Sequence, residues 1–426
     1  MIGRHLVLLC IMKKYLPHLL LALLAAAQPA KAQQLTPAQA LITNEDSLNK
    51  GFTSPKTVIS GYGNANYQRN FNQHESSVNL ERAVLFVGHT FSEKISLFTE
   101  LEVEHAVVAG PNSDDHSSGQ GDVAMEQAFL KFNLNAKQYI IAGLFTPRIG
   151  ITNENHLPVN FNGVERPLVE QLIIPTTWRE IGVGFYGTMD RLPLNYSIAI
   201  VNGLNSANFH HDTGLGEGEG LGSDASANNL AITAAVQYRL PTIKFQVSGY
   251  MGGTVGLSPR GADSLGLNSG GFGTPVYLGE ADLQYANNGI SFKALGTYVS
   301  YPEADRINSA YATNMPTAMY GAYAELGYDW MHPKHVQAQF ISFARMEMLD
   351  MNASIPFNGV YDGTQKQTHI IAGFSYLPLP NIAIKADVRL LHTGPQNTAL
   401  VINPAPNALP YKQNNQFLNL GIAYSF

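Results

Sequence analysis

The sequence has 426 residues, of which 45% are hydrophobic and 14% charged, and its formal net charge is −6. This acidic balance argues against a nucleic-acid partner, because binding to phosphates requires a basic face. The single cysteine, Cys10, lies in the N-terminal stretch, so the rest of the chain excludes disulfides, thiolate nucleophiles and cysteine-ligated metals. Beyond that stretch no run of about twenty apolar residues occurs, which excludes a transmembrane helix.

Residues 1–32 have the pattern of a secretory signal peptide. A basic pair at 13–14 precedes an apolar stretch at 16–27, and Ala-Lys-Ala at 30–32 supplies a small-x-small cleavage site. Either the first methionine or Met12 could begin the chain, because the signal is complete from Met12 onward. Cleavage would remove four basic residues and no acidic one, which changes the net charge from −6 to −10.

Residues 33–55 are polar without a clear period, so we expect a flexible periplasmic leader. From residue 56 to residue 426 apolar and polar residues alternate with a period of two, which is typical of strands with two different faces. We therefore expect one all-β domain over 56–426. Its sixteen predicted strands span 57–67, 76–90, 94–105, 122–134, 138–147, 179–188, 193–203, 230–239, 243–252, 275–286, 289–300, 318–329, 335–346, 367–377, 381–391 and 415–426.

The connections between these strands alternate between short and long. The short ones, such as Ser92-Glu93 and Asn287-Asn288, consist mostly of turn-forming residues. The long ones are 68–75, 106–121, 148–178, 204–229, 253–274, 301–317, 347–366 and 392–414. Short periplasmic turns and long extracellular loops are the layout of a transmembrane β-barrel. A sandwich or a propeller has no cause to produce this alternation.

The last predicted strand has a complete apolar face. Every second residue from Leu418 to Phe426 is apolar, whereas the residues between them, from Asn419 to Ser425, are small or polar and lie on the other side of the strand. A barrel needs such a strand, because the last strand pairs with the first and leaves no open edge in lipid. Taken alone, the segment is also compatible with the final strand of a soluble sandwich.

Charged residues share one face of several predicted strands. They are Glu100, Glu102 and Glu104 in the third strand and Lys385, Asp387 and Arg389 in the fifteenth, each set opposite an aliphatic face. Charge on a lipid-facing position costs several kcal/mol, so these residues are expected to face a water-filled interior. A soluble barrel would alternate in the same way with the faces reversed. The second and fourth strands do not indicate which face is polar.

The longest loop, 148–178, combines apolar residues with charges of both signs. Its charged residues are Arg148, Glu154, Glu165, Arg166 and Glu170, followed by Arg179 and Glu180 at the next strand. Folding into the lumen would bury the apolar residues and narrow the pore. A folded extracellular cap is the alternative. A sixteen-stranded barrel is wide enough to leave an aqueous channel, in which such charges would select what passes.

Three stretches resemble a known family. They are FTELEVEHAVVAG (98–110), AGLFTPRIGITNENH (142–156) and NGVERPLVEQLIIPTTWREIGVGFYG (162–187), which are similar to the phosphate-selective porins O and P. The resemblance covers about 80–205 and weakens beyond it. It implies a sixteen-stranded barrel, a homotrimer, and a third extracellular loop inside the pore. The phosphate-selective members are expected to have a basic constriction, whereas this loop pairs Arg148 and Arg166 with three glutamates, so phosphate selectivity is not carried over.

Other motifs provide weaker candidate sites. The turn at 332–335 (His-Pro-Lys-His) lacks a third metal ligand, so a solvated turn is the preferred interpretation. The acidic segments at 210–224 and 114–116 offer carboxylates for Ca²⁺ but lack EF-hand spacing. No GxSxG motif is present to indicate a hydrolase nucleophile.

The sequence therefore predicts an outer-membrane porin that lets small hydrophilic solutes or ions diffuse passively through a barrel narrowed by the 148–178 loop. Expected partners are outer-membrane lipid, lipopolysaccharide and the solutes, with no enzyme activity, cofactor, metal or nucleic acid. Two alternatives stay open. One is a substrate-dedicated or ligand-binding barrel, for example one selective for anions, and the other is a barrel hydrolase.

Overall fold

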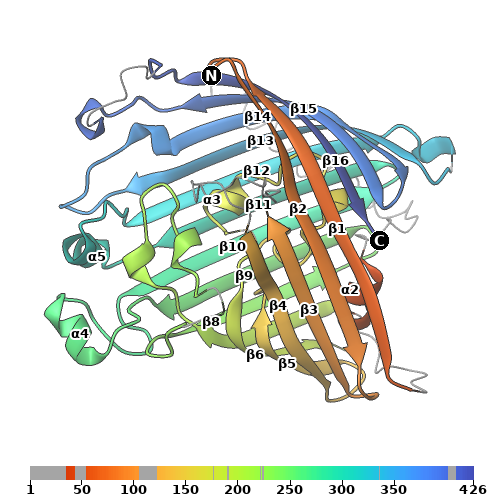
Figure 1. The fold of residues 1–426 in the computed structure, drawn as a ribbon, viewed down its shortest axis with the longest axis horizontal. Coiled ribbons are helices and arrows are strands. Elements are labelled where there is room, and N and C mark those ends of the chain that lie inside the picture. The colour runs from red at the N-terminus through yellow and green to blue at the C-terminus, as the bar shows by residue number, and fades with distance from the viewer. Residues whose placement is uncertain are drawn as a thin grey trace, which may run out of the picture.

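The computed structural model describes residues 35–43, 54–104, 122–175, 177–189, 191–220, 222, 225–334, 336–401 and 409–426. Within these residues sixteen strands pair in sequence order and the last strand pairs with the first, which closes a barrel (Figure 1). The expected signal peptide at 1–32 and its cleavage site lie outside the described residues.

The strands are antiparallel throughout. Their bounds are β1 (Lys56–Asn70), β2 (Glu75–Thr90), β3 (Ile95–Glu104), β4 (Asp122–Asn133), β5 (Gln138–Phe145), β6 (Glu180–Thr188), β7 (Leu194–Asn202), β8 (Leu230–Arg239), β9 (Ile243–Gly253), β10 (Pro275–Asn287), β11 (Ile290–Ser300), β12 (Ala318–Asp329), β13 (Gln339–Ser354), β14 (Lys366–Leu379), β15 (Ile382–Thr393) and β16 (Asn414–Ser425). The prediction of a sixteen-stranded barrel is confirmed. The largest boundary difference is at β13, which begins after the short 3₁₀ helix η4 (His332–Lys334) and runs farther than expected.

The two ends of the chain close the sheet. Tyr62 of β1 lies opposite Ser425 of β16, and the pairing continues to Asn70 opposite Phe417. The backbone N–H of Phe426 donates to the carbonyl of Gly61 at 2.9 Å. The expected pairing of the last strand with the first is therefore present, and the barrel has no free edge there.

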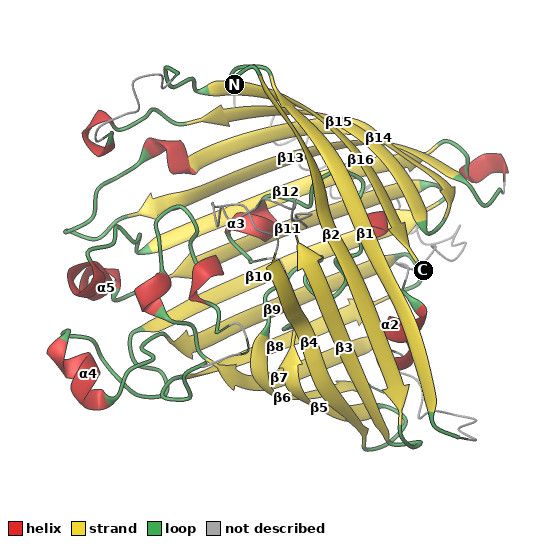
Figure 2. Ribbon diagram, in the orientation of Figure 1, coloured by secondary structure: helices red, strands yellow, loops and turns green. Residues whose placement is uncertain are grey.

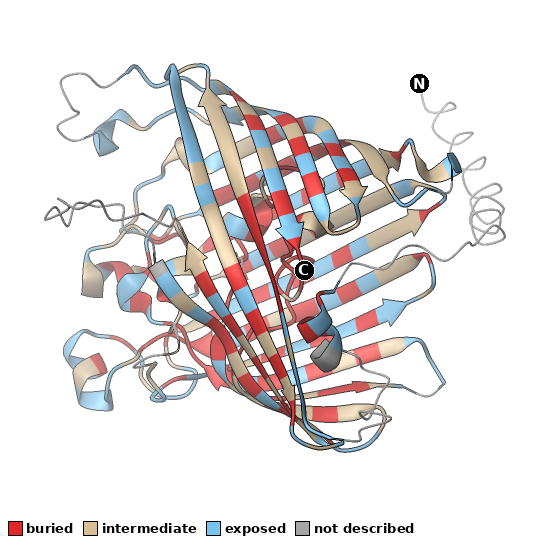
Figure 3. Ribbon diagram, turned by 45° about the vertical axis from the view of Figure 1, so that its right-hand side comes forward, coloured by how far each residue is buried: buried red, intermediate tan, exposed pale blue. Residues whose placement is uncertain are grey.

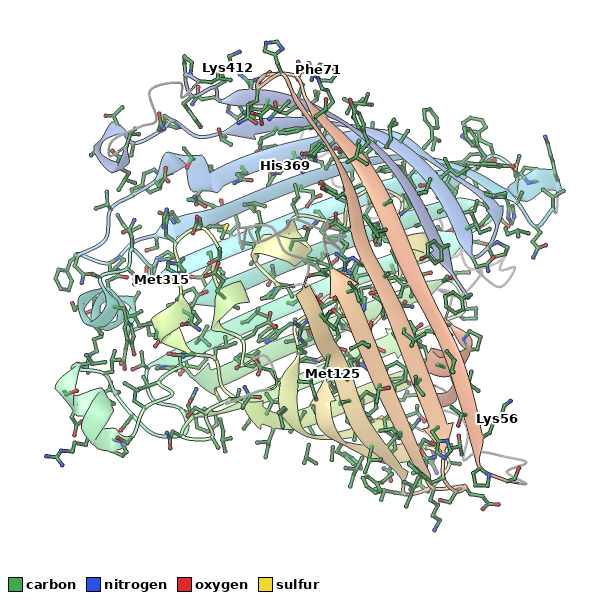
Figure 4. The ribbon with its side chains drawn as sticks, viewed as in Figure 1. Lys56, Phe71, Met125, Met315, His369 and Lys412 are labelled. Carbon is green, nitrogen blue, oxygen red and sulfur yellow. The ribbon has the colours of Figure 1, made fainter. Side chains whose placement is uncertain are left out.

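The connections divide the barrel into a short-turn end and a long-loop end. The long-loop end contains α4 (Pro259–Ser264) and α5 (Ala304–Tyr311) (Figure 2). Lys56 and Phe71, which bracket β1, lie at opposite ends of the barrel (Figure 4). The connection after β1, expected to be long, is only four residues, 71–74, because β1 continues to Asn70.

The outward face of the barrel is apolar and the inward face is polar. In β15, Ile384 and Val388 are 51% and 45% exposed, whereas Lys385 and Asp387 are each 4% exposed. The same alternation runs along most strands (Figure 3). It follows from the strand period of two, which sends successive side chains to opposite faces. The expected inward orientation of the charged faces in the third and fifteenth strands is confirmed.

The second and fourth strands each contain a β-bulge. The register shifts so that Glu81 in β2 and Glu126 in β4 have no partner residue in the neighbouring strand. A bulge inserts one extra residue and reverses the alternation beyond it. Glu126 and the adjacent Gln127 are therefore both buried on the inner side, which explains why the sequence did not indicate the facing of these strands.

A short helix, α2 (Pro37–Thr43), lies against β1, β2 and β3 near the short-turn end. The backbone N–H of Ala38 donates to the hydroxyl of Ser60, which points inward from β1, at 3.2 Å. The expectation of a flexible leader over 33–55 did not include this helix. Among the described residues, no helix is both long and apolar enough to cross a membrane.

Candidate functional site

The loop between β5 and β6 lies inside the barrel. Its helix α3 (Val169–Leu172) contacts β12 and β13 within the barrel (Figure 1). The backbone N–H of Val169 donates to Glu347 of β13 at 3.0 Å, and that of Val164 donates to Asp387 of β15 at 2.7 Å. The loop therefore crosses the lumen from β5 to the opposite wall instead of forming an external cap. Its apolar residues Val164, Val169, Ile173, Ile174 and Trp178 are all buried.

Glu170 holds the loop in its folded shape. Its carboxylate accepts hydrogen bonds from the backbone N–H groups of Ile151 and Thr152 at 2.8 and 2.7 Å. It also accepts one from the hydroxyl of Tyr323 in β12 at 2.7 Å. Glu170, predicted to line the pore, is only 1% exposed. Its position therefore favours a structural role over direct contact with solutes.

Lys385 fixes the loop to the far wall, formed by β12–β15. Its ammonium donates to the carbonyl oxygens of Phe161 and Gly163 at 2.6 and 2.9 Å and also to that of Pro158. Arg389 of the same strand pairs with Glu165 of the loop at 2.7 Å. These contacts hold the central part of the loop against β15.

A second set of charges connects the loop to the near wall, formed by β1–β4. The Nε2 atom of His156 lies 3.0 Å from Glu100 and 3.5 Å from Glu126. Burial alone would lower the pKa of His156, but Glu100 outweighs this effect and raises the pKa to about 9. Arg179 lies 3.5 Å from Glu126. These charges are paired across the junction of loop and wall and are not directed at an open channel.

Arg82 occupies the same near wall, closer to the long-loop end. Its guanidinium lies 3.5 Å from Glu102 and 3.3 Å from Glu104. The exposed fractions of these two side chains are 2% and 38%. Glu104 is therefore the carboxylate of the third strand that solvent in the lumen reaches most readily.

The loop divides the lumen into two cavities. A cavity of about 1320 Å³ lies toward the short-turn end, and one of about 370 Å³ lies on the other side of the loop. Phe161 lines both, and the adjacent 3₁₀ helix η1 (Pro158–Asn160) lies between them. The constriction is therefore at 158–161, in the middle of the longest loop.

The predicted site residues fall into two groups, apart from Arg389, which lines neither cavity and pairs with Glu165 of the loop. Those that line one of the cavities are Arg148, Glu154, Lys385, Glu104, Glu165, Arg166 and Arg179. Those buried beneath the loop or in the wall are Glu100, Glu102, Glu170, Glu180 and Asp387. Arg148 pairs with Glu154 at 2.8 Å in the larger cavity. Glu180 accepts a hydrogen bond from the indole of Trp178 at 3.0 Å.

Several charged residues of the lumen were not predicted. Arg82 and Glu126 belong to the strands whose facing the bulges concealed. Arg345 of β13 pairs with Glu325 at 3.2 Å and with Glu347 at 2.8 Å. In β13, Arg345 and Glu347 alternate with the outward-facing Met346 and Met348. This alternation is the signal that could have identified the two charged residues as inward-facing. His156 lay within a stretch used for the resemblance but was not singled out.

The other candidate sites remain isolated in the structure. His210 lies 3.5 Å from Glu217, and both side chains are more than half exposed. His332 lies in a turn beside the larger cavity. The acidic segment at 114–116, together with Asp224 and His335, lies outside the described residues.

Comparison with known proteins shows the fold. An outer-membrane OmpF of Salmonella typhi, solved with daunomycin, aligns with a TM-score of 0.52 at 11% identity, covering 90% of this chain and 99% of that one. The outer-membrane channel DcaP of Acinetobacter baumannii aligns with a TM-score of 0.50 at 11% identity, over 88% and 99%. The chain shares the fold of these outer-membrane barrels.

Sequence comparisons add a relative but no family. No family model matches the chain. An uncharacterized protein of Aquifex aeolicus (strain VF5) is 29% identical over 343 residues, covering 77% of this chain and 74% of the relative. The comparisons thus support a porin-type barrel. No family model supports the resemblance to the phosphate-selective porins O and P.

Proposed function

We propose that this protein is an outer-membrane porin through which small hydrophilic solutes or ions diffuse passively. The observation that carries the proposal is the opposite polarity of the two faces of a closed barrel, as in Ile384 facing outward and Lys385 inward. Lipid requires an apolar exterior with every backbone group paired, and charges inside require water. The two cavities of the lumen supply the aqueous space on either side of the loop.

The proposal sets the orientation and surroundings of the barrel. The short-turn end faces the periplasm and the long-loop end faces the exterior, as is usual for bacterial barrels. The signal peptide predicted at 1–32 supports export, and the outer-membrane barrels that share the fold support this location. The outer surface of the barrel then contacts membrane lipid and lipopolysaccharide. The homotrimer implied by the sequence resemblance is part of the same proposal.

The charges around the smaller cavity favour a general or cation-leaning pore over a phosphate-selective one. Around the smaller cavity, the cations are Arg82, Arg166 and Arg179 and the anions are Glu81, Glu104, Glu165 and Glu219. Cations and anions are mixed around this cavity, and Arg82 lies 3.3 Å from Glu104 on the same wall, whereas selection of phosphate calls for a basic ring. The carboxylates outnumber the guanidinium groups there, which favours cations.

Single-channel recording in a planar bilayer tests this proposal. Refolded protein in a KCl gradient should show stable conductance, with a reversal potential on the cation side and steps in groups of three. A folded barrel that stays silent would contradict the passive pore.

A ligand-dedicated barrel is the second candidate, and the separation of the two cavities at Phe161 favours it. This candidate requires conductance that changes only when a specific solute is added. Turnover of a lipid or peptide by the purified protein would instead support the hydrolase alternative.

A further inference from the structure

Three buried side chains on the near wall present ligand atoms to one point. Glu100 of β3, Glu126 of β4 and His156 of the loop are each 0% exposed. One nitrogen or oxygen atom from each lies within 4.8 Å of the others. A divalent ion with bonds of about 2.0–2.2 Å to nitrogen and oxygen can contact all three after small side-chain movements.

The orientation of His156 suits a ligand. Its Nδ1 lies 3.1 Å from the carbonyl oxygen of Asn153. A carbonyl oxygen can only accept, so Nδ1 carries a proton, and the Nε2 atom points at Glu100 and Glu126. With no ion bound, Nε2 carries a second proton that faces these carboxylates, and a bound ion would displace that proton. Metal-binding histidines are commonly held in this way by a backbone carbonyl. Glu100 is oriented similarly, because one oxygen accepts from Gln127 at 2.6 Å and the other faces His156.

Glu126 provides an independent observation that points to a ligand at this site. Neither of its carboxylate oxygens has a hydrogen-bond partner among the described residues. Two cationic side chains, His156 and Arg179, each lie 3.5 Å from it. The hydroxyl of Tyr62, whose ring packs edge-on against His156 with centroids 5.8 Å apart, is also buried without a partner. A buried carboxylate left without hydrogen bonds is costly unless an ion or water satisfies it.

We propose that Glu100, Glu126 and His156 bind one divalent transition-metal ion, with zinc as the best fit. One imidazole and two carboxylates suit zinc or manganese better than calcium, which takes six to eight oxygen ligands. The buried hydroxyl of Tyr62, whose ring packs against His156, is a candidate hydrogen-bond partner for a metal-bound water. This proposal does not depend on the porin function.

The position of the site assigns the ion a structural role. β3 and β4 are neighbours in the barrel, and His156 belongs to the loop, five residues before Phe161. An ion bound there would fasten the loop to the near wall, as Lys385 fastens it to the far wall. Both attachments flank the constriction at 158–161.

Metal binding by the tag-free, full-length protein in detergent tests this inference. The protein is stripped with a chelator, its folding is checked by heat-modifiable migration, and ZnCl₂ is added in a calorimeter. One equivalent should bind per chain. Glu126→Gln and His156→Gln, prepared separately, should each weaken binding by about 100-fold or more, because changes to outer-shell partners alone cost about 10- to 100-fold.

The matched control is Glu104→Gln, which removes a carboxylate of the same strand that takes no part in the site. It should bind zinc as the unchanged protein does. Absence of zinc binding by the folded, unchanged protein would overturn the inference and leave His156 as a protonated partner of the two glutamates. Zinc binding that survives in both variants would also overturn it and would point to another site, such as His210 with Glu217.

Discussion

Lys385 contacts Phe161 in two ways. Its ammonium lies 4.0 Å from the centroid of the ring and 2.6 Å from the backbone carbonyl oxygen of the same residue. The first contact is a cation–π interaction, and the second fixes the backbone that carries the ring. One side chain of β15 thus holds the residue that separates the two cavities of the lumen.

The first prediction concerns the ring itself. Phe161→Ala removes the side chain that lines both cavities while leaving the carbonyl that Lys385 binds. Single-channel conductance should rise, because the narrowest part of the path becomes wider. The control is Phe417→Ala in β16, a buried ring that lines neither cavity and contacts Arg389. Unchanged conductance in Phe161→Ala would place the constriction elsewhere.

The second prediction concerns attachment of the loop. Lys385→Met keeps the length of the side chain but leaves three carbonyl groups of the loop without their donor. Each unsatisfied buried group costs about 1–3 kcal/mol. The loop should therefore detach more readily from β15 while the barrel stays closed.

The fluorescence of Trp178 measures this detachment, because its indole is buried and bonded to Glu180. Trp330, the other tryptophan, is replaced by phenylalanine in both proteins so that one signal remains. In urea, the Trp178 signal should change at a lower concentration in Lys385→Met than in the unchanged protein. Coincident transitions in the two proteins would show that Lys385 contributes little to docking.

The strands could be predicted from the sequence because their pattern is local. A period of two identifies a strand and its inward face from a few residues, and this held for β3 and β15. It did not hold for β2 and β4, since the extra residues Glu81 and Glu126 interrupt the alternation. The bulges therefore concealed which face points inward in the two strands that supply Arg82 and part of the proposed metal site.

The contacts of the loop could not be predicted, because they join residues far apart in the chain. The backbone of Val164 bonds to Asp387, a separation of 223 residues. The charged residues of 148–178 were predicted as one group, and their action on solutes stays a prediction. Nothing local distinguishes Glu170, which folds the loop, from Glu165, which lines a cavity. The sequence therefore predicted which charged residues the loop carries but did not distinguish those that fold the loop from those that line a cavity.

The third prediction concerns ion selectivity. Replacing Glu100, Glu102 and Glu104 together with glutamine should shift the reversal potential in a KCl gradient toward anions, because negative charge leaves the lumen wall. Glu104→Gln alone should produce most of the shift, since its side chain is 38% exposed whereas Glu102 is 2% exposed. An exposed charge acts on passing ions because they can approach it closely.

Glu93→Gln provides the matched control for selectivity, because Glu93 is an exposed glutamate in the short turn between β2 and β3, outside both cavities. It should leave the reversal potential unchanged. If the triple variant also shows no shift, these glutamates do not act on the permeating ions.

The fourth prediction concerns helix α2. Leu35 and Gln39 line the larger cavity, and the helix is attached to β1 through Ala38 and Ser60. Deleting residues 35–43 should enlarge the opening at the short-turn end, so conductance should rise. The gain should be smaller than in Phe161→Ala, because resistance in series is dominated by the narrowest section.

The Phe161→Ala variant carrying the same deletion tests whether the constriction has the larger resistance. With the constriction widened, loss of α2 should raise conductance by a larger fraction than it does in the unchanged protein. An equal or smaller fractional gain would mean that α2 does not narrow the path.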